Sequence, residues 1–209
     1  MTTIDEQLTV GTQVPNFELE TYDPGIRAFS KLSLAEIRAK GKWLVLVFYP
    51  ADFTFVCPTE LADLANHHAF LEEIGVEVVS VSTDTKYAHL AWHRDEKLLI
   101  DVNFQMAADP TRTLAKLFGV YDEASGMALR GTFIINPAGV LVSAEVNYFS
   151  VGRNAEELRR KLQAFAHVWE NPEEACPARW KPGARTLTPS ERTVGRVFEA
   201  LGEKVLAAR

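Results

Sequence analysis

Two cysteines, Cys57 and Cys176, are the residues of this 209-residue sequence whose type most directly suggests chemistry. A thiol can pack as a small hydrophobic side chain, ligate a metal, or act as a nucleophile once it is deprotonated. Two cysteines cannot form the disulfide framework of a small secreted domain, and a chain of this length buries roughly 70% of its unfolded surface without one. Each cysteine therefore has to be interpreted from its own surroundings.

Cys57 follows an almost continuously apolar run, residues 42–49, that predicts a strand buried on both faces. Ligands of open α/β sheets bind at the carboxyl edge of such strands. We expect Thr54 to cap a following helix, with Cys57 in its first turn and Pro58 tolerated there because few amides in that turn have intrahelical partners. The positive end of the helix dipole would stabilise a thiolate at this place. Spacing alone nevertheless favours the plainer alternative, a small thiol buried under the helix.

The elements around Cys57 predict an α/β fold. Residues 42–49 and 76–82 are typical of parallel strands, and the helical pattern between them ends at Gly75, which completes a right-handed β-α-β unit. Strands and helices continue to alternate along the chain, as in a central sheet flanked by helices. The further predicted elements are helices over residues 86–94 with Thr85 as N-cap, 111–118 and 154–168, a short strand over 105–108, and a hairpin of strands over 128–135 and 140–148.

Cys176 lies in a segment of different composition. Residues 171–190 contain four of the ten prolines and cannot form a regular helix or a central strand. We therefore divide the chain into one domain, residues 1–168, and a C-terminal arm, residues 169–209.

The arm should end in an amphipathic helix. Thr188 predicts its N-cap, with Pro189 at the first helical position and Glu191 completing a capping box. This helix would pack either on its own core or on a second subunit. Its apolar stripe consists of Val194, Val197, Phe198, Leu201 and Val205.

Charge and hydropathy exclude several classes of partner. The 22 basic and 28 acidic residues give a net charge of −6, which argues against nucleic acid or an anionic membrane as the main partner. The first twenty residues lack the basic start and apolar run of a signal peptide, and the uncharged apolar stretch 43–51 is too short to span a bilayer. We expect a cytoplasmic protein, in which permanent structural disulfides are rare.

Neither a metal nor a cofactor is expected. His67 and His68 are adjacent and point to different helix faces, whereas His89 and His93 share a face but lack the glutamate that follows the first histidine of a zinc-protease helix. No glycine-rich phosphate loop of standard spacing is present, so we predict no bound nucleotide or flavin.

The segment FYPADFTFVCPTE, residues 48–60, resembles the active-site stretch of the peroxiredoxins, whose Pro, Thr and Cys are matched by Pro50, Thr54 and Cys57. The resemblance covers about residues 5–190, and within the family it is greatest to the bacterial alkyl hydroperoxide reductase C subfamily. It implies a thioredoxin-like fold, with a central mixed β-sheet flanked by helices and an extended C-terminal arm. The other matching segments are AHLAW (88–92), LRGTF (129–133), VGR (151–153) and EACPARWKPG (174–183), the last similar to the resolving-cysteine segment of typical two-cysteine members.

The resemblance implies a thiol peroxidase that reduces hydrogen peroxide and organic hydroperoxides to water and alcohols. Cys57 would be the nucleophile, and Arg130 would stabilise its thiolate and bind the peroxide. Thr54 would donate a hydrogen bond to the peroxide oxygens, and Pro50 would shield the thiolate. The reaction needs these groups, because an attack on an O–O bond requires both partners to be held in line and the leaving oxygen to be stabilised as it gains negative charge.

Glu60 and Arg153 would orient Arg130, again by resemblance. Without the surrounding motifs, Arg130 would be interpreted as a solvated strand residue, and Glu60 as a first-turn acid favoured by the helix dipole.

Cys176 would resolve the sulfenic acid formed on Cys57. The resemblance implies an intersubunit disulfide in an antiparallel homodimer, although the spacing of the two cysteines alone does not distinguish a bridge within a chain from one between chains. Without its motif Cys176 would be an exposed tail thiol of no consequence. By analogy, the family implies a decamer built as a ring of five dimers, re-reduced by a flavoprotein disulfide reductase or thioredoxin.

Two other functions remain as alternatives. A thioredoxin-like disulfide oxidoreductase would suit the same fold but needs Cys-x-x-Cys, and position 60 is Glu60. A redox-sensing binding protein with catalytically inert thiols would consume no peroxide through Cys57.

Overall fold

Strand β3 (Trp43–Phe48) is fully buried, as its apolar sequence predicts. In the computed structural model, which describes residues 7–202, β3 lies parallel to β4 (Val76–Ser82), and helix α2 (Cys57–Glu73) connects the two. Gly75 ends the connection with a left-handed φ of +77°, a conformation that strains residues with side chains. The predicted β-α-β unit is confirmed, and it places Cys57 at the first residue of α2.

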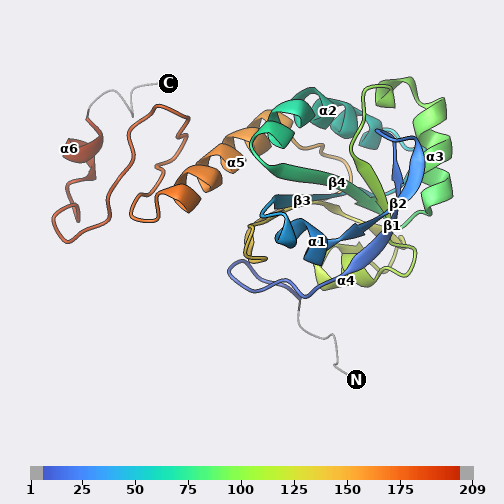
Figure 1. Ribbon diagram of the computed structural model, residues 1–209, viewed down its shortest axis with the longest axis horizontal. Helices are drawn as coiled ribbons and strands as arrows, with labels where there is room; N and C mark the ends of the chain where they lie inside the picture. Colours follow the sequence, from blue (N-terminus) through green and yellow to red (C-terminus); the bar gives the residue numbers. More distant parts are fainter. Residues whose placement is uncertain (1–6, 203–209) are drawn as a thin grey trace. The chain divides into compact units, whose positions relative to one another are not determined.

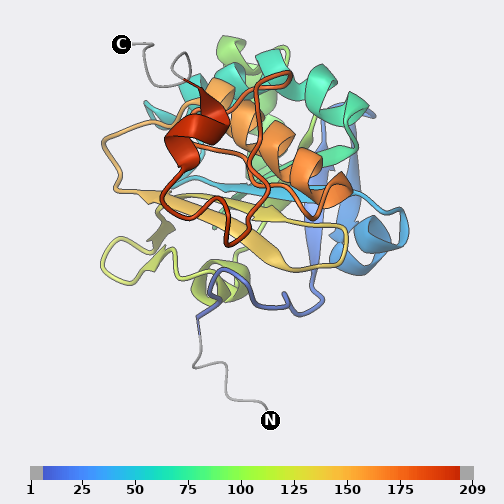
Figure 2. The same ribbon diagram turned by 90° about the vertical axis from the view of Figure 1, so that its left-hand side faces the viewer.

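The central sheet is mixed and has seven strands in the order β2-β1-β5-β4-β3-β8-β9. Figures 1 and 2 show the chain from two directions. The pairs β3/β4 and β4/β5 are parallel, and the other neighbours are antiparallel. This mixed sheet with flanking helices confirms the thioredoxin-like fold class. The remaining strands are β1 (Glu18–Asp23), β2 (Ala28–Ser33), β5 (Gln105–Ala108), β8 (Arg130–Ile135) and β9 (Leu141–Asn147).

Apolar side chains fill both faces of this sheet. On one face Leu44, Leu46 and Phe48 pack with residues of the short helices α1 (Leu34–Ala39) and α4 (Thr113–Leu117). Because successive residues of a strand point to opposite faces, Val45 and Val47 face the other side. Figure 1 shows α2 above the sheet and α1 and α4 below it. The remaining helices of this part are α3 (Lys86–Asp95) and a 3₁₀ turn, Lys97–Leu99.

The hairpin of β8 and β9 carries one irregularity. Ile134 pairs with Ser143, whereas Ile135 pairs with Leu141, so Val142 is an extra residue on β9. Such a bulge bends the strand and increases its local twist. The predicted first strand of this hairpin is also shorter than expected, since Ala128 belongs to β7 (Met127–Ala128), which pairs with β6 (Tyr121–Asp122) in a separate two-stranded sheet.

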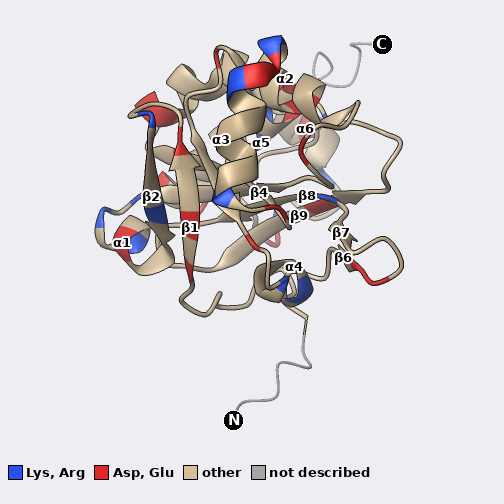
Figure 3. Cartoon of the chain, turned by 90° about the vertical axis from the view of Figure 1, so that its right-hand side faces the viewer, with Lys and Arg blue, Asp and Glu red and all other residues tan. Residues whose placement is uncertain are grey.

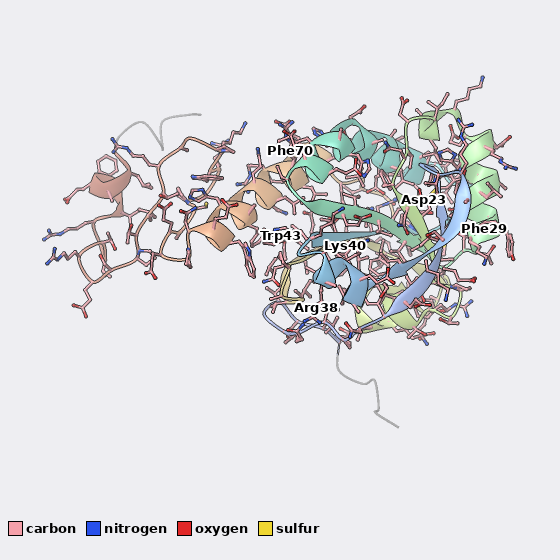
Figure 4. All side chains as sticks on the ribbon, in the orientation of Figure 1. Asp23, Phe29, Arg38, Lys40, Trp43 and Phe70 are labelled. Atoms are coloured by element: carbon pink, nitrogen blue, oxygen red, sulfur yellow. The ribbon has the colours of Figure 1, made fainter. Side chains whose placement is uncertain are left out.

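The N-terminal part was not predicted. Strands β1 and β2 and helix α1 had no clear sequence signal, because β2 buries mainly Leu32 and lacks a regular alternation of apolar and polar residues. Contacts with α3 hold this edge in place. Lys86 lies 2.8 Å from Glu20, and the ring of Phe29 lies 5.2 Å from that of Tyr87. Figure 4 labels Phe29 at this edge of the sheet, beside α3.

Acidic and basic residues are interspersed along β1, β2 and α1 (Figure 3), and Lys31 of β2 pairs with Glu18 of β1 at 2.6 Å. Within residues 7–202, none of the helices has the length and apolar character needed to cross a bilayer.

The chain divides into two compact units, Met1–Ala155 and Glu156–Arg209. In the second unit, α5 (Ala155–Glu170) agrees with the helix predicted over 154–168 and leads into an irregular segment. Ala175 and Leu187 form an isolated antiparallel bridge within that segment, so the arm doubles back on itself.

The prediction that Thr188 caps the start of the terminal helix is wrong. Residues 191–195 form turns, and α6 (Val197–Leu201) begins only after Gly195, which has a left-handed φ of +72°. The hydroxyl of Thr193 accepts a hydrogen bond from the Ser190 amide, which stabilises a turn in place of the expected capping box. Val205, the last residue of the predicted stripe, lies outside the described residues.

Gly131 gives the first testable prediction, because β8 passes close to other side chains there. A Cβ atom at this position would lie 2.6 Å from Phe133 Cε2 and 2.8 Å from Val120 Cγ1. Gly131→Ala should therefore lower the free energy of unfolding by about 1–3 kcal/mol through overpacking. Urea unfolding followed by circular dichroism measures this loss. Ala144→Ser on the exposed face of β9 is the control, and an equal effect of both substitutions would contradict the prediction.

Candidate active site

Cys57 is the first residue of α2, and its side chain is fully buried. The N-cap of the helix is Val56, whose side chain makes no capping bond, so the prediction that Thr54 caps the helix is wrong. Instead, the Thr54 hydroxyl lies 2.9 Å from Cys57 Sγ and 2.7 Å from the carbonyl oxygen of Ala51. With its single proton, the hydroxyl can donate a hydrogen bond either to the sulfur or to this carbonyl.

Arg130 approaches the same sulfur from β8. Because β8 is antiparallel to β3, its first residue lies at the carboxyl end of β3, beside the start of α2. The Arg130 Nη1 atom is 3.4 Å from Cys57 Sγ, and its Nε donates a 2.7 Å hydrogen bond to the carbonyl of Phe149. A buried guanidinium is therefore fixed within contact distance of the Cys57 sulfur, beside which it places a positive charge and N–H donors.

Glu60 lies one turn beyond Cys57 on α2 and binds both arginines of the site. Its Oε2 accepts a 2.6 Å hydrogen bond from Arg130 Nη1, and its Oε1 accepts bonds from the Arg153 side chain at 2.8 Å and from the Arg153 amide at 2.9 Å. Arg153 Nη1 also donates to the carbonyl of Gly131 at 2.7 Å. These contacts form a network that spans α2, β8 and the segment after β9.

The charges of this network leave a positive excess. Burial by itself would raise the pKa of Glu60, but hydrogen bonds and charge from Arg153, together with the charge of Arg130, outweigh it and lower the pKa. One ionised carboxylate thus stands between two guanidinium groups. The uncompensated positive charge is available to a thiolate at Cys57 and to an electron-rich substrate oxygen beside it.

Pro50 is buried in the loop that leads from β3 to α2. Its predicted role of shielding the thiolate stays a prediction.

A second buried polar cluster was missed by the sequence analysis. His89 Nδ1 lies 2.8 Å from Asp52 Oδ2, its Nε2 lies 3.1 Å from the carbonyl of Ala107, and Tyr49 donates a 2.7 Å hydrogen bond to Asp52 Oδ1. Burial raises the pKa of Asp52 despite the opposing contact with His89. This cluster anchors the loop before Cys57 to α3. Most of the β-α-β unit lies between Asp52 and His89 in the sequence, so their spacing did not predict this contact.

Trp92 supports the same loop by packing. The indole is buried and lies 5.7 Å from the ring of Tyr49 and 6.4 Å from that of Phe53. His93, weighed above with His89 as a metal ligand, lies 2.9 Å through Nε2 from the carbonyl of Val102.

Cys176 belongs to the second unit of the chain, and both cysteines are free thiols. Its Sγ lies 3.8 Å from the carbonyl of Ala164 on α5, in a cavity of about 710 Å³ between that helix and the arm. Burial and the negative charge of Glu174 raise the pKa of the thiol, whereas Arg160 opposes them. The docked thiol is therefore mainly protonated at neutral pH.

Comparisons with known proteins agree with this site. Residues 10–144 match the family model described as the AhpC/TSA family, and residues 164–200 match the C-terminal domain of 1-Cys peroxiredoxin. Alkyl hydroperoxide reductase C of Amphibacillus xylanus is 45% identical over 90% of this chain and 98% of that protein, and its Staphylococcus aureus counterpart is 43% identical over the same shares.

Solved structures extend the likeness to the fold. The crystal structure of Enterococcus faecalis AhpC has a TM-score of 0.76 and 46% identity over 80% of this chain and 98% of that chain. The reduced 2-Cys peroxiredoxin of Plasmodium vivax has a TM-score of 0.82 and 32% identity over 88% of this chain and 94% of that chain. With a thiol, an arginine and a threonine meeting at the start of α2, the chain belongs to the AhpC/TSA family and is a peroxiredoxin.

Proposed function

We propose that this protein reduces hydrogen peroxide and organic hydroperoxides, with Cys57 as the nucleophile. The observation that carries the proposal is the placement of Cys57 Sγ between Thr54 Oγ1 at 2.9 Å and Arg130 Nη1 at 3.4 Å, at the first residue of a helix. Two donors and a helix N-terminus all favour negative charge at this point. The 45% identical alkyl hydroperoxide reductase C supports hydroperoxides as the substrates.

The first step forms a sulfenic acid on Cys57. The thiolate attacks one peroxide oxygen, an S–O bond forms and the O–O bond breaks. The leaving oxygen takes the electron pair and a proton, giving water from hydrogen peroxide or an alcohol from an organic hydroperoxide. Arg130 and Thr54 are placed to bind the two oxygens, and their hydrogen bonds strengthen as negative charge moves to the leaving oxygen. Glu60 and Arg153 act through Arg130 by fixing its position.

The second step uses Cys176. Its sulfur attacks the sulfur of the Cys57 sulfenic acid, an S–S bond forms, and the hydroxyl leaves as water with the thiol proton. We assign this Cys176 to the partner subunit of a homodimer, carried by an arm of residues 169–209 beyond the peroxidase domain of residues 1–168. Cys57 is fully buried at the helix start, so bond formation requires local movement at both thiols.

The catalytic cycle closes when an external dithiol reduces the disulfide with two electrons and two protons. A flavoprotein disulfide reductase or thioredoxin is the proposed donor, and a reducing cytoplasmic setting keeps both thiols available. A ring of five dimers is the proposed assembly, by analogy with the family.

A disulfide oxidoreductase is the weaker alternative. That reaction needs a second thiol in the first turn of α2, at position 60, whereas Glu60 holds two arginines there.

A single experiment tests the peroxidase and its resolving step. Anaerobically reduced protein is mixed with one equivalent of hydrogen peroxide and run on a non-reducing gel, while residual peroxide is measured. The wild type should consume the peroxide and form a covalent dimer. Cys176→Ser should consume it without the dimer, and Cys57→Ser should do neither. Unconsumed peroxide with the wild type would sink the peroxidase. Consumption without a dimer band would overturn only the intersubunit bridge.

A further inference from the structure

The segment that carries Cys176 is fastened to α5 on both sides of the cysteine. A disulfide requires two sulfurs to approach to about 2.0 Å, so Cys176 has to leave its place beside Ala164 before it can resolve a sulfenic acid. We propose that His167 and Glu174 form a clasp that holds this segment on α5 and limits the rate at which Cys176 is released. The role of the clasp in the catalytic cycle rests on the proposed function, whereas the contacts that form the clasp do not.

The clasp closes on the N-terminal side of Cys176. His167 Nε2, in the last turn of α5, lies 2.7 Å from Glu174 Oε2, two residues before the cysteine. Asn171 shapes the connection between them, since its backbone amide and its side chain both donate to the carbonyl of His167 at 2.9 Å, and its own carbonyl accepts from the Glu174 amide. Both side chains of the pair are about one-third exposed, at 30% and 34%, so the contact is open to exchange with water.

The same imidazole also contacts the C-terminal side of Cys176. The ring of His167 lies 4.9 Å from the indole of Trp180, which is buried and donates from Nε1 to the carbonyl of Ala184. Arg160 of α5 donates a 3.1 Å hydrogen bond to the carbonyl of Trp180. One histidine thus binds both flanks of the resolving cysteine, and losing its contacts loosens both.

Release also changes the chemistry of the thiol. Among the described residues, the charged groups that line the cavity at Cys176 are Glu174, Arg160 and Lys161, and Arg160 is partly neutralised by Glu157 at 2.7 Å. Burial and Glu174 hold the thiol protonated while it is docked, and a protonated thiol is a weak nucleophile. An undocked Cys176 therefore gains both mobility and thiolate character, so the clasp couples access to reactivity.

The clasp can be tested without peroxide, because Cys57→Ser leaves Cys176 as the sole thiol of the chain. The rate of alkylation by iodoacetamide, measured from pH 6 to 10, gives a limiting rate that reports release and a midpoint that reports thiol ionisation. His167→Leu in this background should raise the limiting rate about fivefold, the effect of one partly exposed hydrogen-bonded pair. His167→Gln retains an N–H donor for Glu174 and should return the rate to within about twofold of the parent, which a merely structural role would not explain.

Glu174→Gln is the second variant and separates the two effects. It should raise the limiting rate and also lower the midpoint, because the negative charge beside the thiol is removed. Glu173→Gln, at the exposed neighbouring acid, is the matched control and should change neither. Limiting rates of His167→Leu and Glu174→Gln equal to the control, or slower than it, would overturn the clasp.

The same changes in the protein with both cysteines connect the clasp to the reaction. After one equivalent of peroxide, His167→Leu should form the disulfide faster than the wild type, as followed by quenched-flow alkylation and non-reducing gels. Faster labelling of Cys176 without any disulfide would leave the clasp standing and contradict the proposed function. Unchanged labelling of Cys176 with normal disulfide formation would contradict the clasp and leave the proposed function standing.

Discussion

Replacing Arg130 by methionine should lower kcat/KM for hydrogen peroxide about a thousandfold, the cost of removing a preorganised donor to the reacting oxygens. Methionine fills much of the same volume but has neither charge nor a strong donor. The variant therefore loses the Nη1 contact 3.4 Å from Cys57 Sγ and the positive charge beside that sulfur. Stopped-flow measurement of peroxide consumption at saturating reductant gives the ratio directly.

Arg130→Lys separates charge from geometry. Lysine keeps the positive charge but cannot bond Phe149 and Glu60 in the fixed fork of a guanidinium, so we expect an intermediate loss of about a hundredfold. Arg94→Met, at an exposed arginine of α3, is the control and should be neutral. Equal activity of Arg130→Met and Arg94→Met would show that the guanidinium is dispensable, and the proposed roles would have to be reassigned.

Glu60→Gln should produce the largest loss of stability, about 3–5 kcal/mol in the free energy of unfolding, because it leaves two buried guanidinium groups without their carboxylate. The side chain of Glu60 is only 4% exposed, so water cannot replace the lost charge. Peroxidase activity should fall as well, since Arg130 loses the partner that positions it. Guanidinium chloride unfolding measures the stability, with Glu73→Gln at the exposed end of α2 as the control.

The pH dependence of this loss has a defined sign. The pKa of Glu60 is lower in the folded protein than in the unfolded chain, so its contribution is complete above the ordinary carboxyl pKa of about 4.3 and is lost as the pH falls through the lowered value. The wild type should therefore lose stability as the pH falls below about 5, because the unfolded chain takes up the proton of this carboxyl before the folded protein does. Glu60→Gln should lose less over the same range. If the free energies of unfolding of the two proteins changed in parallel with pH, Glu60 would not be the source of the loss.

Much of the site follows from sequence because its parts are local. The apolar β3 and the periodic α2 fix the position of Cys57 within one β-α-β unit, and the turn of helix that separates Cys57 from Glu60 puts both on neighbouring positions of α2. The prediction that Arg130 lies near Cys57 came from the resemblance to a family, because nothing in the spacing reveals that β8 pairs with β3.

Other parts needed the tertiary structure. The Thr54 hydroxyl contacts the Cys57 sulfur, although we predicted that it caps the helix. By spacing alone, a hydroxyl three residues before Cys57 suits a helix amide and the sulfur equally well. Asp52 and His89 meet only when α3 packs beside the loop, and the late start of α6 depends on turn bonds around Thr193 that compete with the capping pattern.

The bulge at Val142 has a consequence for how the family's motifs should be compared. Arg130 opens the β8–β9 hairpin opposite Asn147, and Arg153 follows its close. Deleting Val142 would remove the unpaired residue and leave these pairs unchanged, so the bulge can absorb a change in the length of β9. Deleting a residue between Asn147 and Arg153 would also leave every motif residue unchanged, yet shorten the path to Arg153 by about 3.3 Å. That distance exceeds the tolerance of a hydrogen bond. Motif identity alone therefore does not guarantee an assembled site, and the spacing between motifs carries equal information.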